Sequence, residues 1–390
     1  MRFEEAYESW QAKRLTQEEA AQLLGVCARS FRRYIDRYHD EGLEGLCDKR
    51  LNQVSHRKAP VDEVLALEAL YKEQAEDWNI KHFYDKKYSG DRSYTWVKKT
   101  LQSANLSRPG KRKGKHHKKR ERSPLPGMLI HQDGSTHQWV PGVYWDLIVT
   151  MDDANNEVYS AFFVDEEGTW SSLQGVRETI EKKGLFCSFY SDRGSHYWHT
   201  PEAGGKVDKA NPTQFGRALD ELGIARIAAY SPQARGRSER LFRTWQDRLV
   251  KELASEGITD MAAANQYIQE VFLPEFNKQF TVTASEEGSV FVSLLTPSMG
   301  DILCLKQQRT VGNDNCVSYK GLSLQIPKQK QRCHYMKAKV RVHEYQDGCL
   351  AVFHGPRRLA DYDATGQLIE NKCQQADAAR LSMKAAIASS

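Results

Sequence analysis

The chain has 390 residues, enough for two to four domains, because a single hydrophobic core usually stops growing near about 250–300 residues. Its 40% hydrophobic and 27% charged residues are typical of a globular protein and exclude a membrane protein and a disordered one. The net charge of +5 is uneven: residues 1–123 carry 27 Lys and Arg against 19 Asp and Glu, and the rest of the chain is slightly acidic.

The sequence predicts a cytoplasmic protein without membrane contacts. No apolar run reaches the roughly 18 residues that a membrane-spanning helix needs. The first ten residues, MRFEEAYESW, contain acids and lack the apolar centre of a signal peptide.

The eight cysteines are scattered without a CxxC pair, so neither a disulfide framework nor a zinc ribbon is indicated. A zinc site built from Cys27, His39, Cys47 and His56 is an alternative with irregular ligand spacing. Buried free thiols are the favoured interpretation.

Residues 1–50 are predicted to form a helix-turn-helix domain. Thr16 and Glu19 have the spacing of a capping box, and apolar residues follow at helical spacing as far as a turn at Gly25-Val26-Cys27. A second helix is expected from about Arg29 to Tyr38, and a helical hairpin that binds protein is the alternative. Four arginines on that helix are the candidate contacts to a DNA major groove: Arg29, Arg32, Arg33 and Arg37.

Residues 51–107 are predicted to form a second helix-turn-helix-like domain. Helices are expected near Leu65–Tyr71 and Ile80–Tyr88, followed by a third that ends near Ala104. Two such domains would cover about two turns of duplex DNA. The candidate DNA contacts here are Arg92, Lys98 and Lys99, although the aromatic residues of this region could equally serve packing.

Residues 108–123 are predicted to be a basic linker that also binds DNA. Between Arg108 and Arg122 the chain holds nine basic residues and one acid. Such a density of charge repels itself in isolation and is neutralised by phosphates, whereas a merely solvated linker is the alternative. The candidate contacts are Lys111, Arg112, Lys113, Lys115, Lys118, Lys119 and Arg120.

After Pro124 short apolar runs alternate with helical segments. The runs MLIHQD, YWDLIVTMDD and VYSAFFVD predict three consecutive strands, with a turn at Asn155-Asn156 between the last two. A helix, a strand, a helix, a strand and a long helix from Arg235 are expected to follow. This order of elements is that of a ribonuclease-H-like (RNase H-like) α/β catalytic core, which we expect over residues 124–280.

Residues 281–365 are predicted to form a small β-barrel that also faces DNA. Short alternating runs are separated by Gly and Asn, and nine Lys and Arg against three acids fall between positions 300 and 345. The polar, alanine-rich tail of residues 366–390 predicts no function. The chain as a whole is therefore expected to be a multidomain α+β protein.

Three acids are the candidate catalytic residues and metal ligands. Asp133 is expected at the end of the first strand and Asp192 at the end of the fourth, and in this fold the two strands are central neighbours. Glu239 is expected near the start of the last helix, which packs across the same edge. Carboxylates suit Mg²⁺ or Mn²⁺, and two ions about 3.5–4 Å apart would activate water or a 3′-hydroxyl and stabilise the departing 3′-oxygen.

Each of these acids also has a structural alternative, since carboxylates near strand ends often cap helices or bind water. Asp152 and Asp153 are competing candidates, but we expect them at the far end of the hairpin, beside its turn. His137, His196 and Tyr197 lie near the acids in sequence and could position a DNA strand or serve packing.

Helical spacing predicts which side chains of the last helix share the face of Glu239. They are Arg235, Phe242, Arg243 and Gln246. Leu241, Trp245 and Leu249 are expected to point to the core. Arg235, Arg243 and Gln246 would then flank a phosphodiester, with ordinary surface ion pairs as the alternative.

Two segments carry a resemblance to a known family. SPQARGRSER, which runs through Glu239, and YSDRGSHY, around Asp192, resemble segments of insertion-sequence DDE transposases with a retroviral-integrase-like core, close to the ISNCY type. The resemblance covers roughly residues 10–360. It implies a bacterial, nucleoid-associated enzyme that acts on double-stranded DNA as a homodimer or larger assembly, and that cuts element ends and joins them to target DNA.

The chain departs from the family pattern at Arg193, where Asn is common, and at Arg235-Gly236, where Asn-Gly is common. Neither substitution removes a metal ligand. The departures therefore bear on how the protein holds the DNA end, and not on whether strand cleavage and joining occur. A nuclease without joining activity and a DNA-binding regulator with an inert core are the rival functions.

Overall fold

The computed structural model describes residues 2–48, 58–109, 121–202, 205–230, 236–294, 299–329 and 332–369. The chain divides into two compact units, Met1–Glu76 with Phe83–Pro109, and Asp77–His82 with Gly110–Ser390. No described helix is long and apolar enough to cross a membrane. Several predicted residues lie outside the described ranges, namely His56, Arg235, the tail and Lys111, Arg112, Lys113, Lys115, Lys118, Lys119 and Arg120.

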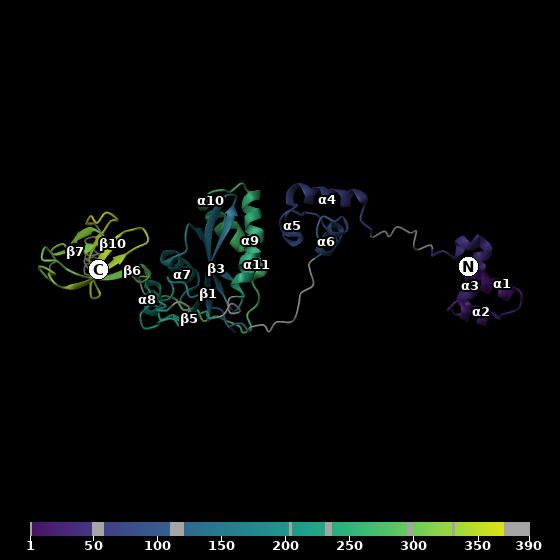
Figure 1. Cartoon of the computed structure of the whole chain (residues 1–390), viewed down its shortest axis with the longest axis horizontal. Helices are drawn as coiled ribbons and strands as arrows, with labels where there is room; N and C mark the ends of the chain where they lie inside the picture. The colour runs from purple at the N-terminus through teal and green to yellow at the C-terminus, as the bar shows by residue number, and fades with distance from the viewer. Residues whose placement is uncertain are drawn as a thin grey trace, which may run out of the picture. The chain divides into compact units, whose positions relative to one another are not determined.

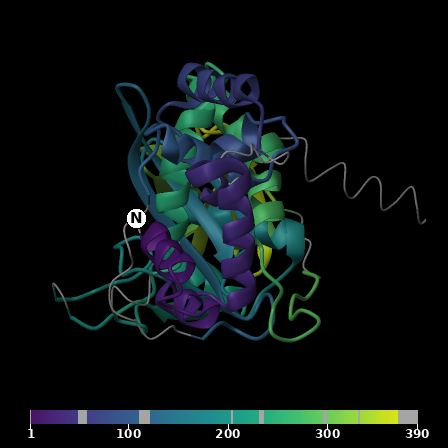
Figure 2. The same ribbon diagram turned by 90° about the vertical axis from the view of Figure 1, so that its right-hand side faces the viewer.

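Three helices form the N-terminal part of the first unit: α1 (Arg2–Gln11), α2 (Gln17–Leu23) and α3 (Ala28–Glu41). They pack around Phe31, which is fully buried (purple in Figure 2). The predicted capping box is confirmed, because Thr16 Oγ1 accepts the Glu19 N–H at 3.2 Å and Glu19 Oε2 accepts the Thr16 N–H at 2.7 Å. Helix α1 was not predicted, although its apolar residues recur at helical spacing.

A short 3₁₀ helix, η1 (Gly42–Leu46), follows α3, and three more helices have the bounds α4 (Val61–Ala75), α5 (Ile80–Lys86) and α6 (Tyr94–Ser103). The three helices predicted in this region are therefore confirmed. Tyr71 of α4 and Phe83 are both buried and meet edge to face, with ring centroids 5.0 Å apart. These two aromatic residues serve packing, which is the alternative that the sequence left open.

A five-stranded sheet is the centre of the second unit (Figure 1). Its strands are β1 (Ile130–Val140), β2 (Val143–Asp152), β3 (Val158–Val164), β4 (Ser188–Ser191) and β5 (Ala225–Ala228), in the order β3-β2-β1-β4-β5. The first three strands pair antiparallel, whereas β4 pairs parallel with both β1 and β5. The first and fourth strands are central neighbours, as predicted.

Helices cover both faces of this sheet (Figure 1). On one face lie α7 (Thr169–Lys183) and α8 (Gln214–Glu221); on the other lie α9 (Ser238–Ser255), α10 (Met261–Tyr267) and α11 (Leu273–Phe280), the last two joined by a π-helical turn, Ile268–Phe272. Leu241, Trp245 and Leu249 of α9 are buried, as predicted. The prediction for Phe242 was wrong: it is 7% exposed and belongs to the same core, because the sheet and α11 together cover a wide face of α9.

The C-terminal region begins with α12 (Met299–Ile302) and contains strands β6 to β11. Their bounds are Leu305–Thr310, Cys316–Tyr319, Leu322–Gln325, Lys339–Glu344, Leu350–His354 and Arg357–Tyr362. A four-stranded antiparallel sheet has the order β11-β10-β9-β6, while β7 and β8 form a separate hairpin that shares its core. The described strands do not pair into a closed ring, so the predicted β-barrel is not confirmed.

The interpretation of the cysteines needs correction. The seven described cysteines are free, but only Cys304 is buried, whereas Cys27, Cys47, Cys187 and Cys333 are exposed. Burial was predicted from composition alone, and composition does not indicate which face of a turn or strand a cysteine occupies.

Candidate active site

Strand register places Asp133 and Asp192 at the same height in the sheet. The last parallel pair between β1 and β4 joins His131 to Tyr190. Asp133 lies two residues farther along β1, and Asp192 lies two residues past Tyr190, just beyond the end of β4. Because side chains two residues apart point to the same face of a strand, Asp133 projects on the same side of the sheet as His131. Asp133 and Asp192 both line one small pocket, together with Ser238 at the start of α9.

The surroundings of the two aspartates differ. Asp133 is 8% exposed and lies inside β1, which continues to Val140, so the prediction that it ends the first strand was wrong. Asp192 is half-buried, immediately follows β4, and accepts the Gly194 N–H at 2.8 Å. This backbone donor fixes the orientation of the Asp192 carboxylate.

Helix α9 packs on the face of the sheet that carries Asp133. Gln246 Nε2 donates to Ser135 Oγ at 3.0 Å, and Ser135 is two residues beyond Asp133 on the same strand. Gln246 was expected beside a phosphodiester; it instead anchors α9 to β1. Arg243 on the same helix is exposed.

Glu239 lies in the first turn of α9 and is exposed. Its chain neighbour Ser238 lines the aspartate pocket, but Glu239 itself does not. Among the described residues, no three His, Cys, Asp or Glu side chains are gathered closely enough to hold a metal ion. The structure therefore brings Asp133 and Asp192 together and leaves Glu239 one residue away from their pocket.

A buried ionic network lies behind the aspartates. Asp153 is fully buried, forms an ion pair with Arg237, and lies 2.9 Å from His131 Nε2 through Oδ1. Arg237 precedes α9 and also donates to the carbonyl oxygens of Asp153 and Glu121, each at 3.1 Å. Since His131 lines the aspartate pocket, this network joins β1, the β2–β3 turn and the start of α9.

Asp152 has a structural role, as expected for a residue at the turn. It accepts the Gly127 N–H at 2.7 Å, the Ala154 N–H at 2.8 Å and the Tyr159 hydroxyl at 3.0 Å. Burial raises the pKa of Asp152, and these three donors oppose that rise. Its neighbour Asp153, by contrast, reaches the aspartate pocket through His131.

A further carboxylate, Glu167, lies beside the aspartates. Its Oε1 is 3.3 Å from His196 Nε2 and accepts the Tyr197 hydroxyl at 3.4 Å, while Tyr197 also donates to Gln132 Oε1 at 2.9 Å. A Cβ at position 134 would press on the carboxylate of Glu167, which would have to move. The pKa of the Tyr197 hydroxyl is raised by burial and then by the charges of Glu167, Asp133 and Asp192, so all three act on it electrostatically.

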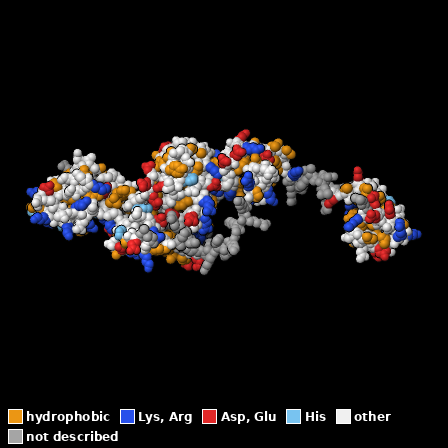
Figure 3. Space-filling model, in the orientation of Figure 1, with side chains coloured by type: hydrophobic (Ala, Val, Ile, Leu, Met, Phe, Trp, Pro, Cys, Tyr) orange, Lys and Arg blue, Asp and Glu red, His pale blue; other side chains and the backbone are white. Residues whose placement is uncertain are grey.

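The side chains predicted to contact DNA differ in their exposure and in their ion pairs. Lys98 and Lys99 are exposed on α6, and Arg92 forms a bidentate pair with Glu63, with both N–O distances 2.7 Å. Figure 3 shows basic and acidic side chains interspersed on the visible face of the N-terminal helices. The four arginines predicted on α3 are all exposed: Arg29, Arg32, Arg33 and Arg37.

Comparison with known proteins finds a DNA-binding domain family and two transposases. Residues 8–59 match the family described as a winged helix-turn helix. The chain is 30% identical over 376 residues to "Putative transposase y4bF" of Sinorhizobium fredii, an alignment that covers 92% of this chain and 81% of that protein. It is 25% identical over 269 residues to the transposase for insertion sequence IS1202 of Streptococcus pneumoniae, covering 67% of this chain and 57% of that protein.

Two solved structures show distant similarity. A chain of the simian T-cell lymphotropic virus intasome in complex with PP2A regulatory subunit B56 gamma is 15% identical with a TM-score of 0.36, covering 74% of this chain and 97% of that chain. The HTLV-2 integrase catalytic core domain in complex with magnesium, in its trimeric form, is 16% identical with a TM-score of 0.30, covering 38% of this chain and 87% of that chain. At these scores the similarities assign no role to any residue.

Proposed function

This chain belongs to the insertion-sequence transposases, and from that premise we propose that it binds the ends of a mobile DNA element, cuts them and joins them to target DNA. The observation that carries the proposal is the pair Asp133 and Asp192, the first within β1 and the second just beyond the adjacent β4, which line one pocket with the first residue of α9. We further propose Glu239 as the third acid of this site, because it follows Ser238 in the same helical turn.

The donors present fit Mg²⁺ or Mn²⁺. Asp133 and Asp192 offer hard carboxylate oxygens in one pocket, which is the ligand chemistry these ions prefer. Two ions bound there would supply activation of the attacking oxygen and charge stabilisation of the leaving 3′-oxygen. The Gly194 N–H orients the Asp192 carboxylate, and the Arg237–Asp153 ion pair fixes the first turn of α9. In this proposal both contacts hold the acids in position when DNA binds.

The N-terminal helices supply sequence recognition in this proposal. The exposed arginines of α3 have the position of a recognition helix, and the matched winged helix-turn helix covers them. Two element ends must be held together for joining, so we also propose a homodimer or larger assembly, acting on the bacterial nucleoid. The domain bounds predicted from the sequence stay part of this proposal.

A cleavage and joining assay tests the proposal. Full-length protein is incubated with labelled duplexes from both ends of the mobile element, with a plasmid target and with Mg²⁺, Mn²⁺ or EDTA. We expect nicking at the element end and covalent joining to the plasmid, both dependent on the metal. Cleavage without joining would support the nuclease instead, and binding without either reaction would support the inert regulator.

Removing residues 1–105 is expected to abolish specific end binding and to leave nonspecific cleavage, because the recognition helix is lost while the aspartates remain. The measurement is competition between element-end and random duplexes. A subtler variant, Arg33→Gln with Arg37→Gln, should lower the specificity ratio; each good base contact is worth about 1–3 kcal/mol of discrimination. Specific binding by the truncated protein would contradict the assignment.

Neutralising four basic residues of segment 108–122 is expected to weaken DNA binding in a salt-dependent way. Each lost phosphate contact should reduce the slope of log K against log salt by roughly 0.9, because fewer counterions are released. Binding is measured by anisotropy from low to moderate salt, with four lysines replaced by glutamine. An unchanged slope would show that the segment only tethers the two parts of the chain.

A further inference from the structure

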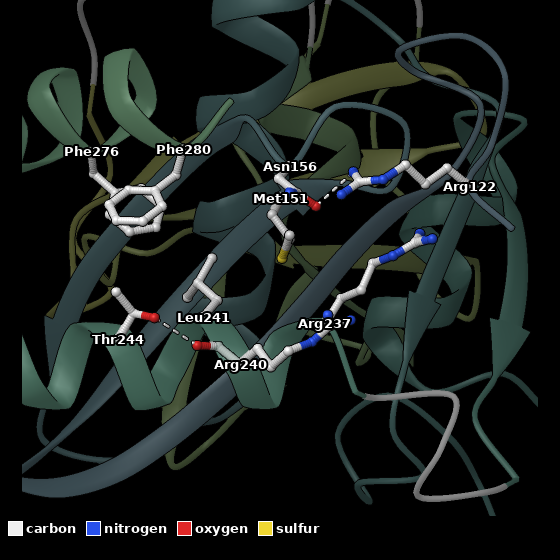
Figure 4. Close-up of a pocket in the computed structure, with 9 residues that line it drawn as sticks. All are labelled: Arg122, Met151, Asn156, Arg237, Arg240, Leu241, Thr244, Phe276 and Phe280. Atoms are coloured by element: carbon white, nitrogen blue, oxygen red, sulfur yellow. Dashed lines mark hydrogen bonds between the residues drawn. The ribbon is translucent and has the colours of Figure 1, made fainter. Parts of the chain in front are cut away.

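Three arginines gather at a second pocket, which lies near the first turn of α9 (Figure 4). One side of it is lined by Arg122, Arg237 and Arg240, and the other by Phe276 and Phe280 of α11. The aromatic side belongs to the core, because Phe272 stacks on Phe276 and the Arg248 guanidinium lies over the ring of Phe280. The volume of about 150 Å³ is too small for a whole nucleotide, so a ligand here would be a small group that meets the arginines.

Neutral oxygens hold the guanidinium of Arg122. Its Nη1 donates to Asn156 Oδ1 at 2.8 Å and to the Ala154 carbonyl at 3.2 Å. Within the described ranges, its Nη2 and Nε have no acceptor. The turn between β2 and β3 therefore fixes the direction of this cation and leaves its remaining N–H groups available.

Arg240 is held in a similar way on α9. Its Nε donates to the Gly236 carbonyl at 2.7 Å, and its two Nη groups have no acceptor in the part of the chain that the structure describes. Burial lowers the pKa of Arg122, and the positive charge of Arg240 lowers it further, so the two cations act on each other. No Asp or Glu occurs among the described residues that line the pocket.

Arg122 and Arg240 are thus like charges whose nearest partners are neutral. Arg237 does not add to the excess charge, because it pairs with Asp153. Two such cations are stabilised by an anion between them. Phosphate suits them in particular, since a guanidinium group can donate two parallel hydrogen bonds to its oxygens.

The place of this pair in the chain indicates which phosphate it would meet. Arg240 follows Glu239 in the first turn of α9, and Ser238 of the same turn lines the aspartate pocket. Arg122 is the last residue of the basic segment 108–122. DNA that reaches the aspartate pocket would therefore have its backbone close to the two arginines.

We propose that Arg122 and Arg240 together bind one backbone phosphate of the DNA, close to the phosphodiester that is cut. The phosphate group alone lies at the arginine side of the pocket, and its sugars and bases stay outside. The inference rests on the proposed function, since it assumes that DNA occupies the aspartate site. It adds a fixed contact that determines which phosphodiester lies beside Asp133 and Asp192, and hence where the strand is cut.

Uncharged phosphates test this proposal without catalysis. Full-length protein in EDTA is titrated with a set of element-end duplexes, each with one methylphosphonate in place of a single phosphate near the cut. One position should weaken binding by about tenfold, because it loses a charge-assisted pair of hydrogen bonds. In Arg240→Gln, which changes an exposed side chain, and separately in Arg122→Gln, that position should weaken binding by less than about threefold.

Lys278→Gln is the matched control, because it removes one exposed positive charge from α11 and does not line the pocket. It should keep the tenfold effect. If both arginine variants also keep it, with unchanged circular dichroism, the phosphate site is wrong although DNA binding stands. Failure of the unchanged protein to bind any duplex would instead overturn the proposed function.

Two further measurements examine the source of the phosphate and its role. Calorimetry with inorganic phosphate would show a site for a free anion, and overturn the strand assignment, if Arg240→Gln lost that binding while keeping the tenfold effect on DNA. With Mg²⁺ present, both arginine variants should spread the cut over neighbouring phosphodiesters. A cut that stays at one position in both variants would overturn the role in setting the cleavage position.

Discussion

Asp192→Asn is expected to abolish strand cleavage and joining while leaving end binding within about twofold of the unchanged protein. The substitution preserves volume but removes the charge that a divalent cation needs, and Asp192 is not part of the helix α3 to which end recognition is assigned. Asp133→Asn and Glu239→Gln should have the same effect. Because ligands of one site act as a unit, a double variant should be scarcely worse than either single one.

The measurement is single-turnover cleavage of a labelled element end in saturating Mg²⁺, with end binding measured in parallel. Glu181→Gln is a matched control, since it removes an exposed carboxylate from α7, away from the aspartate pocket. Full activity of Glu239→Gln with loss in both aspartate variants would remove Glu239 from the site. In that case Glu167, which lies near the pair, becomes the next carboxylate to replace.

The order of strands in the catalytic unit could be predicted because its apolar runs are short, dense and separated by turn residues. The extent of β1 could not. Beyond Asp133 the strand reads GSTHQWV, which is polar, yet it pairs with β2 as far as Val140. Pairing satisfies its backbone whatever the side chains are, so composition carries little signal there. The prediction that Asp133 ends the first strand was therefore wrong, whereas the neighbouring positions of the first and fourth strands were predicted correctly.

The side chains around the aspartates were harder to predict than the aspartates themselves. Asp153 and Arg237 are 84 residues apart, and each alone reads as a surface charge; only the fold makes them a buried pair. Glu167 precedes α7 in a run of acids, and only the fold brings it to Gly134 of β1 and to His196. The error for Phe242 has a similar origin. Helical spacing gives the direction of each side chain around the helix axis, but it does not give how wide a face of α9 the rest of the protein covers.

Arg237→Ala is expected to lower the free energy of unfolding of the catalytic unit by about 3–5 kcal/mol, because it leaves the carboxylate of Asp153 buried without its cation. It should also slow cleavage more than it weakens end binding, since the carbonyl contacts of Arg237 fix the start of α9 and hence Ser238 and Glu239. Lysine at this position keeps the charge but not the forked donors, so Arg237→Lys should recover stability only in part.

A double-mutant cycle separates the ion pair from a general loss of packing. Asp153→Asn removes the buried charge that Arg237→Ala would strand, so the double variant should be more stable than the sum of the single losses predicts, by more than about 1 kcal/mol. Unfolding in urea gives the stabilities, and cleavage rates are compared only where the proteins remain folded. Strictly additive losses would mean that the two side chains do not depend on each other. Because His131 lies 2.9 Å from Asp153 and lines the aspartate pocket, a coupled pair here would tie the stability of the fold to the position of the acids proposed for catalysis.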